Sequence, residues 1–517
     1  MKKPFYITTA IAYASSIPHV GNVYEAVLAD SIARFKRLDG FDVYFQTGTD
    51  EHGLKIQTKA NELGISPKDH VDNISNDIKR IYKTLDVSYD FFLRTTDEKH
   101  QEMVQKIFKK LYDQGDIYLD KYSGWYSVSE EAYIFEKDIV DGKGPNGDTL
   151  IWMEEETYFF DLKKYQARLV KYIKDNPNFI QPESRKNEML QNFLSEPLQD
   201  LSVTRKNMDW GIHSFDKEHT IYVWIDALTN YITSFDLDDN FTSPKFEKYW
   251  PADIHLIGKD ILRFHTIYWP IMLMALDIEL PKVIFGHPWV LIDKSKMSKS
   301  KGNTIYTDDI LKHFPKDSLR YYMLHEIPYA SDGNLTYELL IERHNSDLTN
   351  TLGNLVNRTI GMINKYRGGM VKKAFTKETY EIDLVKSSES LLDNVRSKMD
   401  QYKVSDALEE IMKVLRQANK FIDVTEPWNL KKDSNKQDEL DGVLYELIET
   451  IRITTTLLQA FIPETASRIY DQINCHINTF ASTIKFGAFP DNHTLNKPEA
   501  LFERYDSEKK MAEILGE

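Results

Sequence analysis

The 517-residue chain is 41% hydrophobic and 28% charged, with a formal net charge of −15. This is the composition of an ordinary globular protein, and the length favours roughly three domains because single cores rarely exceed ~250–300 residues. The one cysteine, Cys475, excludes an intrachain disulfide and a cysteine-built metal site and suits a cytoplasmic protein, while the acidic total argues against nonspecific coating of nucleic acid.

The first hundred residues predict alternating strands and helices. Phe5–Ala10 is rich in β-branched and aromatic residues, Asn22–Leu38 has apolar residues at helical spacing, and Phe41–Thr47 is again strand-like. Further on, Ser66 is a helix cap with Pro67 in the first turn. A strand–helix–strand order implies a parallel sheet, so we expect an α/β domain.

The middle of the chain changes texture and then returns to strand signals. From about 115 to 220 the segments are short, acidic and aromatic, which predicts an inserted subdomain and not another strand–helix–strand unit. Strand patterns return at His219–Leu228 and Ala252–Gly258. A helix is predicted over Ile261–Leu276 and a strand over Lys282–Ile292.

Beyond about Leu335 the pattern is helical nearly to the end. Val404–Ile422 predicts a helix capped by Ser405 or Asp406, with one apolar face formed by Leu408, Ile411, Met412 and Leu415. Leu444–Phe461 predicts a second, with Leu444, Leu447, Ile448 and Ile451 on its apolar face. These patterns indicate a helical bundle.

Two loops have the composition of phosphate-binding segments. Asp293–Asn303 holds four lysines, three serines and a glycine, and it follows a predicted strand. Pro18–Asn22 lies between a strand and a helix, where His19 can donate to a phosphate oxygen and Gly21 allows a close backbone approach. If both loops belong to one sheet, they can hold a polyphosphate between them. The alternatives are a solvated charged loop and a capping histidine.

A third candidate stretch is Leu256–His265, at a predicted strand end. Asp260 can accept hydrogen bonds from sugar hydroxyls, although a helix-capping carboxylate is the common alternative. Trp224 and Tyr231 are seven residues apart, so they share a face of a helix with or without a ligand.

These motifs together resemble the class I aminoacyl-tRNA synthetases. The segment HVGN at His19–Asn22 is similar to the first signature of that family, and KMSKS at Lys296–Ser300 is the second unaltered. The segments TGTDEHG (Thr47–Gly53), YVWIDAL (Tyr222–Leu228) and EPWNL (Glu426–Leu430) resemble the methionyl branch. The resemblance runs from Phe5 to about Lys510.

The resemblance implies a fold, a reaction and domain limits. The fold is a Rossmann-like parallel-sheet catalytic domain (1–115 and 221–290) with an inserted connective peptide (116–220), a signature-loop and stem-contact region (291–350), and a helical anticodon-binding domain (351–517). The reaction joins L-methionine and ATP into methionyl adenylate and pyrophosphate, and then transfers methionyl to the 3′ end of methionine and initiator tRNA. Mg²⁺ is expected on the ATP phosphates.

The resemblance also implies site residues at matching positions. Transition-state charge would be met by His19, Asn22, Lys296 and Lys299, and ATP would also contact Gly21 and Asp260. Asp50 would hold the amino group of methionine, and the pocket would be completed by Ala10, Ile11, Tyr13, Trp224, Ala227, Tyr231, Ile261 and His265. Anticodon bases would meet Asn354, Arg358 and Trp428, near a basic cluster of Arg358, Lys365, Arg367, Lys372 and Lys373.

The chain departs from the family pattern at two places. Asn22 stands where the first signature usually has a second histidine; it can donate a hydrogen bond but cannot be cationic. Many relatives carry a zinc knuckle in the insertion, and the aligned positions here are Ser127, Glu130, Gly144 and Gly147. These cannot form a thiolate site, so we expect no structural zinc, and a knuckle packed by Trp125, Tyr126, Tyr133 and Phe135.

Three alternatives to the methionyl family are disfavoured by the sequence. Isoleucine, valine and leucine enzymes carry a large editing insertion, and the segment between Trp125 and Trp224 is too short for one. A non-catalytic RNA-binding paralogue would be expected to lose His19 or the signature lysines. A nucleotidyltransferase with both signatures would lack the helical half.

The longest apolar run, Tyr268–Leu276, is too short to cross a bilayer. The first residues lack the long apolar segment that a secretory signal needs. We expect a cytoplasmic monomer.

Overall fold

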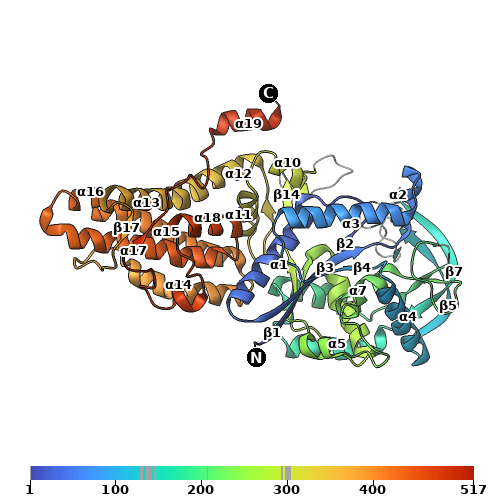
Figure 1. Cartoon of the computed structure of the whole chain (residues 1–517). Helices are drawn as coiled ribbons and strands as arrows, with labels where there is room; N and C mark the ends of the chain where they lie inside the picture. The colour runs from blue at the N-terminus through green and yellow to red at the C-terminus, as the bar shows by residue number, and fades with distance from the viewer. Residues whose placement is uncertain are drawn as a thin grey trace.

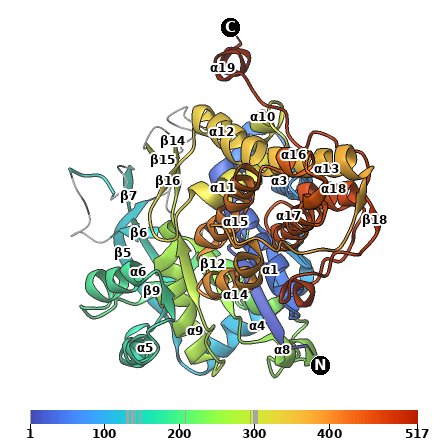
Figure 2. The same cartoon turned by 90° about the vertical axis from the view of Figure 1, so that its left-hand side faces the viewer.

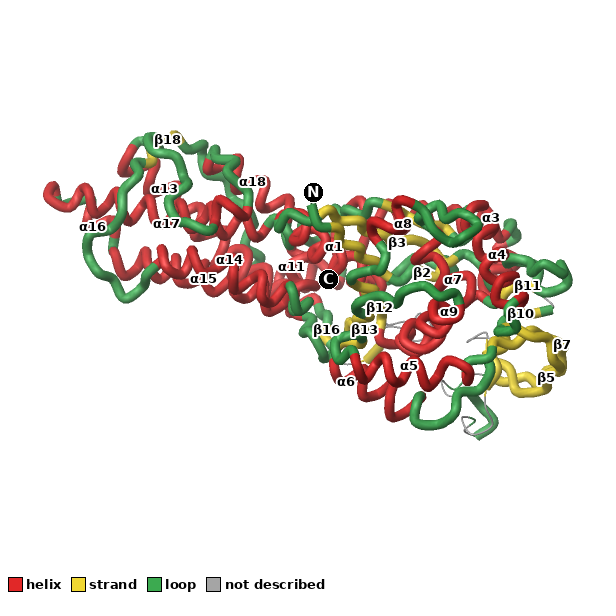
Figure 3. Tube along the Cα trace, turned by 90° about the horizontal axis from the view of Figure 1, so that it is seen from below, coloured by secondary structure: helices red, strands yellow, loops and turns green. Residues whose placement is uncertain are grey.

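The structure is a computed structural model that describes residues 2–127, 132–134, 139, 141–144, 147, 149–206, 208–292, 295–296 and 304–516. The molecule is elongated, with a mixed sheet-and-helix half formed by the N-terminal residues and a helical half formed by the C-terminal residues (Figures 1 and 3). The predicted class, an α/β domain followed by a helical bundle, is confirmed.

A seven-stranded parallel sheet organises the first half. Its order is β2-β3-β1-β12-β13-β8, with β4 also paired to β3. The strands are β1 (Pro4–Thr9), β2 (Ala12–Tyr13), β3 (Asp42–Asp50), β4 (Phe91–Arg94), β8 (Ile180–Gln181), β12 (Ile254–Gly258) and β13 (Ile284–His287). Along β1, Phe5 and Ile7 belong to one apolar core and Tyr6 to the other, so both faces of the sheet are covered.

Helices cover both faces of this sheet. They are α1 (Val20–Leu38), α2 (Leu54–Leu63), α3 (Pro67–Thr84), α4 (Glu98–Asp113), α5 (Lys163–Asp175), α6 (Glu183–Glu188), α7 (Val223–Thr233), α8 (Pro244–Tyr249) and α9 (Trp269–Ala275), with η2 (Met189–Phe193), η3 (Lys259–Ile261) and η4 (Phe264–Tyr268) between them. The predicted cap of α3 is confirmed, because the Ser66 side chain accepts from the backbone N–H of Asp69 and Pro67 opens the helix.

Residues 116–220, which separate the N-terminal strands of the main sheet from β12 and β13, contribute to two different sheets. Strands β5 (Ile117–Ser127), β6 (Ala132–Ile134), β7 (Leu150–Phe160) and β9 (Leu201–Ser202) form an antiparallel sheet, which lies on the opposite side of the molecule from β18 (His493–Thr494) in Figure 2. Helix α5 packs on α9, and β8 pairs with β13 in the main sheet. The range 116–220 therefore supplies both a separate sheet and one edge of the main sheet, in contrast to the expectation of an insertion alone.

Two strand predictions need correction. Of His219–Leu228, only β11 (Thr220–Ile221) is a strand, which pairs with β10 (Thr204–Arg205), and the helix α7 begins at Val223. All side chains of α7 except Trp224 are buried, so its apolar run lacks the polar face that marks a helix in sequence.

The second correction concerns Lys282–Ile292. Pro288 separates β13 of the main sheet from β14 (Val290–Ile292), which joins β15 (Ser295–Lys296) and β16 (Gly333–Asn334) in a small sheet of its own. The expectation that the two loops share one sheet is therefore wrong, because the strand that leads into the lysine-rich loop belongs to a different sheet from β1, which precedes the His19 loop.

The second half is a bundle of helices. They are α10 (Thr307–Leu311), α11 (Lys316–Glu326), α12 (Tyr337–Arg343), η6 (His344–Gly353), α13 (Asn354–Arg367), α14 (Leu384–Met399), α15 (Val404–Thr425), α16 (Pro427–Leu430), η7 (Ser434–Lys436), α17 (Gln437–Leu458), α18 (Pro463–Ile473), η8 (Phe480–Thr483) and α19 (Ser507–Leu515), with β17 (Met370–Val371) paired to β18. Within the described part of the chain, none of the helices has the length and apolarity that a membrane span requires.

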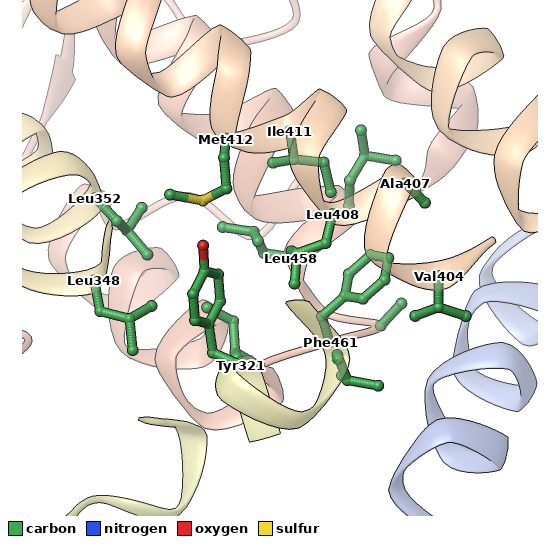
Figure 4. Packing of buried hydrophobic residues seen from close by; sticks show 14 of the residues in the cluster. Tyr321, Leu348, Leu352, Val404, Ala407, Leu408, Ile411, Met412, Leu458 and Phe461 are labelled. Carbon is green, nitrogen blue, oxygen red and sulfur yellow. The ribbon is translucent and has the colours of Figure 1, made fainter. Parts of the chain in front are cut away.

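The apolar faces predicted for α15 and α17 are confirmed, since all eight of their named residues are buried. Figure 4 shows Leu408 and Met412 of α15 beside Tyr321 of α11 and Leu458 of α17. The predicted cap is wrong, because α15 begins at Val404 after Lys403 and no side-chain capping bond is formed there. Burial of the face, and not a cap, fixes where this helix begins.

Candidate active site

Residues far apart in sequence meet at the carboxyl ends of the central strands. Ala10 follows β1, and its N–H donates to the carbonyl of Leu256 in β12 at 3.0 Å. Asp50 ends β3 and pairs in register with Tyr13 of β2. In a parallel sheet these ends share one edge, which is the usual place for a ligand.

Close packing at this edge requires a glycine. A Cβ at Gly48 would lie 2.1 Å from the carbonyl oxygen of Leu93 in β4 and 3.0 Å from Cγ2 of Ile11. Glycine therefore lets β3 and β4 approach while Ile11 packs against the same strand. The predicted pocket residues Ala10, Ile11, Tyr13 and Asp50 are all brought to this edge.

Two of the predicted pocket residues form a buried, neutral hydrogen-bonded pair. The Tyr231 hydroxyl is 2.7 Å from Nε2 of His265, and Nδ1 of His265 is 3.0 Å from the carbonyl oxygen of Ile261. A carbonyl only accepts, so Nδ1 carries the ring proton and Nε2 accepts from the Tyr231 hydroxyl. Burial lowers the pKa of His265 to about 4 and raises the pKa of Tyr231 well above its ordinary value. Both groups are therefore uncharged near neutral pH.

Aromatic rings form the wall of this pocket. Trp224 stacks on Phe264 with ring centroids 3.7 Å apart and an interplanar angle of 6°. The His265 ring stands edge-on to Trp224 at 6.2 Å, and Ala227 is buried on the same helix as Trp224 and Tyr231. Phe264 is missing from the predicted pocket residues. Its position immediately before His265 in the sequence is the one feature that could have indicated it.

The first signature lies at the start of α1. His19 is the N-cap of this helix, and its Nδ1 accepts from the backbone N–H of Asn22 at 3.3 Å. The capping alternative is therefore observed. It leaves the proton of a neutral His19 ring on Nε2, so that this nitrogen is a donor.

The segment that follows the lysine-rich loop contacts the start of α1. The N–H of Val20 donates to the carbonyl of Ile305, two residues after that loop, at 3.0 Å. The backbone of Lys296 pairs with Leu291. Lys299 lies outside the described residues. The start of α1 is thus bonded to the chain that leaves the lysine-rich loop.

Asp260 is exposed in η3, where its Oδ1 accepts from Nε1 of Trp289 at 3.3 Å.

A further acidic group that sequence reasoning missed is Glu25, whose Oε2 is 2.8 Å from Nε2 of His287. Burial raises the pKa of Glu25. Burial opposes charge on His287 as well, but its bond to Glu25 raises the pKa of His287 overall. Glu25 lies three residues after Asn22 on α1, and residues at this spacing share one face of a helix. The predicted helix therefore already placed Glu25 on the same face as the first signature.

The predicted anticodon residues lie far from this edge, in the helical half. Asn354 and Arg358 are one turn apart on α13, and Nη2 of Arg358 is 3.1 Å from Asp423 of α15. Trp428 is exposed on α16. The predicted basic cluster is not wholly available to RNA, because both Arg367 and Lys372 bond to Asp441.

The positions in the insertion that align with the zinc ligands of relatives are only partly described by the structure. Ser127, Gly144 and Gly147 belong to the described part of the chain, whereas Glu130 and Phe135 lie outside it. Trp125 packs edge-on against Trp152 at 5.3 Å, and Tyr126 is buried. Among the described residues there is no group of three or more His, Cys, Asp or Glu side chains placed to hold a metal ion.

Comparisons with known proteins agree with this geometry. The family described as tRNA synthetases class I (M) matches residues 5–149 and 146–360, and the anticodon binding domain of methionyl tRNA ligase matches residues 371–513. A methionine–tRNA ligase of Clostridium tetani is 51% identical over 99% of this chain and 80% of that protein. The corresponding protein of Bacillus subtilis is 45% identical over 99% of this chain and 79% of its own length.

Solved structures are similar over the same extent. The methionyl-tRNA synthetase of Mycobacterium tuberculosis in complex with methionyl-adenylate has a TM-score of 0.92 and 40% sequence identity, covering 97% of this chain and all of that one. Its free form has a TM-score of 0.85 and 38% identity. Because both family descriptions and these identities extend over nearly the whole length, the chain belongs to the methionyl family of class I aminoacyl-tRNA synthetases.

Proposed function

We propose that methionine is activated in the pocket between α7 and the ends of β1, β3 and β12. As a member of the methionyl family the chain is an ATP-dependent methionine–tRNA ligase, which forms methionyl adenylate and transfers methionyl to tRNA. The observation that carries this placement is the neutral Tyr231–His265 pair beside the Trp224–Phe264 stack. An uncharged pocket walled by aromatic rings suits a polarizable thioether, which such rings attract.

The remaining pocket residues would orient the amino acid. Asp50, at the end of β3, would bind the ammonium group, while Ala10, Ile11, Tyr13 and Ile261 would close the pocket around the side chain. With the thioether at Tyr231 and the ammonium at Asp50, the carboxylate would be left to face the start of α1. Orientation of this kind is itself a large part of catalysis when two substrates must meet.

The phosphates of ATP would lie at the start of α1. A methionine carboxylate oxygen forms a bond to the α-phosphorus while the bond to pyrophosphate breaks, and negative charge accumulates on the phosphoryl oxygens. Nε2–H of His19, the backbone at Gly21, the Asn22 amide, Lys296 and Lys299 would donate to those oxygens. Asp260 would accept from the ATP ribose. Little proton transfer is needed, so positioning and positive charge carry the catalysis.

Mg²⁺ would enter with ATP. This ion keeps several waters and is commonly held by substrate phosphates together with only one or two carboxylates, so a dedicated protein cage is not required. When bound, Mg²⁺ neutralises charge on the leaving pyrophosphate.

The tRNA would extend to the helical half. Splayed anticodon bases would stack on Trp428 and bond to Asn354 and Arg358, the mode that proteins use for single-stranded RNA. Methionine tRNA and initiator tRNA are both proposed substrates. A monomeric state and a cytoplasmic location stay predictions; light scattering of the pure protein would test the first.

The proposal is tested by amino-acid-dependent exchange of pyrophosphate into ATP. The expected result is exchange with methionine alone among the twenty amino acids, and exchange with a different amino acid but none with methionine would overturn it. Lys299→Ala is expected to lower exchange by at least 100-fold while methionine binding, measured by calorimetry, changes little. An equal loss of binding and exchange would make that lysine structural.

A further inference from the structure

A buried polar network lies behind the proposed methionine pocket. His52 follows β3, Asp226 is in the first turn of α7, and His100 is in the first turn of α4. Nδ1 of His52 is 2.7 Å from Oδ2 of Asp226, and Nε2 of His100 is 2.7 Å from Oδ1 of the same carboxylate. The three residues are 4%, 1% and 2% exposed, respectively. One carboxylate therefore joins three elements out of contact with solvent.

The hydrogens of this network can be assigned. Each oxygen of Asp226 faces one ring nitrogen, so an ionised carboxylate accepts from both rings. Burial raises the pKa of Asp226, but the two imidazoles outweigh this and hold it below its ordinary value. Nδ1 of His100 is 2.7 Å from Oγ1 of Thr233, which donates to it when the ring is neutral. The network resists deformation, because a shift of either ring would leave an oxygen of the buried carboxylate without its donor.

The network joins the two sides of the proposed pocket. His52 lies two residues after Asp50, the proposed ammonium partner, and Asp226 lies between Trp224 and Ala227 of the wall. On its other side His52 stands edge-on to Trp210 at 5.5 Å, and Nε1 of Trp210 donates to the carbonyl of Glu51 at 2.6 Å. The segment after β3 is thus held by Asp226 on one side of His52 and by Trp210 on the other. Asp226 connects the Asp50 end of β3 to the α7 wall.

We propose that His52, Asp226 and His100 are positioning residues that fix the distance between Asp50 and the α7 wall and thereby set the affinity for methionine. This inference rests on the proposed function. It predicts an effect on methionine and not on ATP, because His19 and Asp260 belong to other elements. A buried charge that only stabilised the fold would alter all kinetic constants together.

The test compares steady-state constants of pyrophosphate exchange. In Asp226→Asn the amide oxygen can accept from one ring only, while its NH₂ group faces the N–H of the other. The KM for methionine is expected to rise about 10- to 100-fold, with the KM for ATP within about 2-fold. Asp216→Asn is the matched control: Asp216 also bonds to a buried histidine, His219 at 2.8 Å, but away from the pocket, so its KM for methionine should not change.

Conservative variants separate positioning from folding. His52→Asn keeps a donor in the place of Nδ1, and His100→Gln keeps one in the place of Nε2, so both should stay within about 5-fold of the wild-type KM for methionine. His52→Leu and His100→Leu lack the donor and should resemble Asp226→Asn. If Asp226→Asn fails to fold, these pairs still show whether the network positions the pocket or only stabilises the fold.

Two results would overturn the inference: equal KM values for methionine in the Asn or Gln variants and in their Leu counterparts, or parallel changes in the constants for methionine and ATP. Absence of methionine-dependent exchange in the wild type would instead overturn the proposed function.

Discussion

The proposed methionine pocket and the proposed anticodon-binding face differ most in how far their side chains are buried. In the pocket, Tyr231 is 1% and His265 is 2% exposed, and each has a hydrogen-bond partner before any ligand arrives. On the helical half, Trp428 is 37% exposed, and the side chain of Arg358 is 33% exposed beside Asp423. One site is built into a core, whereas the other lies on a surface.

The difference follows from the size and stiffness of the ligands. Methionine is small, so selective binding depends on a pocket whose polarity and width are set in advance. An anticodon brings its own extended surface, and bases can stack on exposed side chains that need little support. Substitutions in the pocket should therefore change stability and methionine binding together, while those on the helical face should change tRNA binding alone.

The largest effect is expected from a buried ion pair in the helical half. Arg452 binds both oxygens of Glu449, at 2.7 and 2.8 Å, and both side chains are fully buried in α17. Arg452→Ala leaves a buried carboxylate without its counter-charge, so the free energy of unfolding should fall by about 3–5 kcal/mol. Urea denaturation measures this.

Arg416→Ala is the control, because it removes an exposed ion pair with Glu409 and should cost less than about 1 kcal/mol. If Arg452→Ala also raised the KM for methionine, the two halves would be coupled more closely than the comparison suggests.

The next effect is a pH dependence of stability from the pocket. His265 has a pKa of about 4 in the folded protein, below the ordinary value of 6.5, because burial disfavours its charged form. The unfolded chain therefore binds more protons between these values. The stabilisation is complete above pH 6.5 and is lost as the pH falls, by about 3 kcal/mol at pH 4.

Urea unfolding of the wild type and of His265→Gln across pH 4–7 should show the steeper decline in the wild type. Parallel curves for the two proteins would contradict the assigned protonation state of His265.

A smaller effect is expected from the hydroxyl in the pocket. Tyr231→Phe leaves Nε2 of His265 buried without its donor, and an unsatisfied buried group costs about 1–3 kcal/mol. The KM for methionine in pyrophosphate exchange should rise about 10-fold. Tyr445→Phe is a matched control in the helical half, since that hydroxyl donates to the carbonyl of Phe489 at 2.9 Å. It should lower stability to a similar extent and leave the KM for methionine unchanged.

The smallest effect on the protein itself is expected at the helical face. Trp428→Ala should change stability by less than about 0.5 kcal/mol, because the ring is exposed. It should still lower kcat/KM for tRNA in aminoacylation by roughly 5- to 150-fold, the cost of about 1–3 kcal/mol for one stacked base. Pyrophosphate exchange should not change. Phe375→Ala, another exposed aromatic residue of this half, should leave aminoacylation intact.

Much of the fold could be predicted from local patterns. The strand–helix–strand start, the cap at Ser66 and the buried faces of α15 and α17 were each predicted correctly, because burial on one face leaves a periodic trace in sequence. The prediction failed at α7, which is buried on nearly all sides and so has no such trace. It also failed at Pro288, where one apolar run is divided between two sheets.

By itself, the sequence determined the family, the reaction and the residue types available to it, since short motifs such as HVGN and KMSKS retain their order along the chain. Tertiary structure alone decided which groups are charged and which meet. It placed Tyr231 against His265, bonded Val20 at the start of α1 to Ile305 after the lysine-rich loop, and joined His52 to His100 through Asp226. Protonation depends on burial and on partners distant in sequence, and neither is set by the neighbours of a residue along the chain.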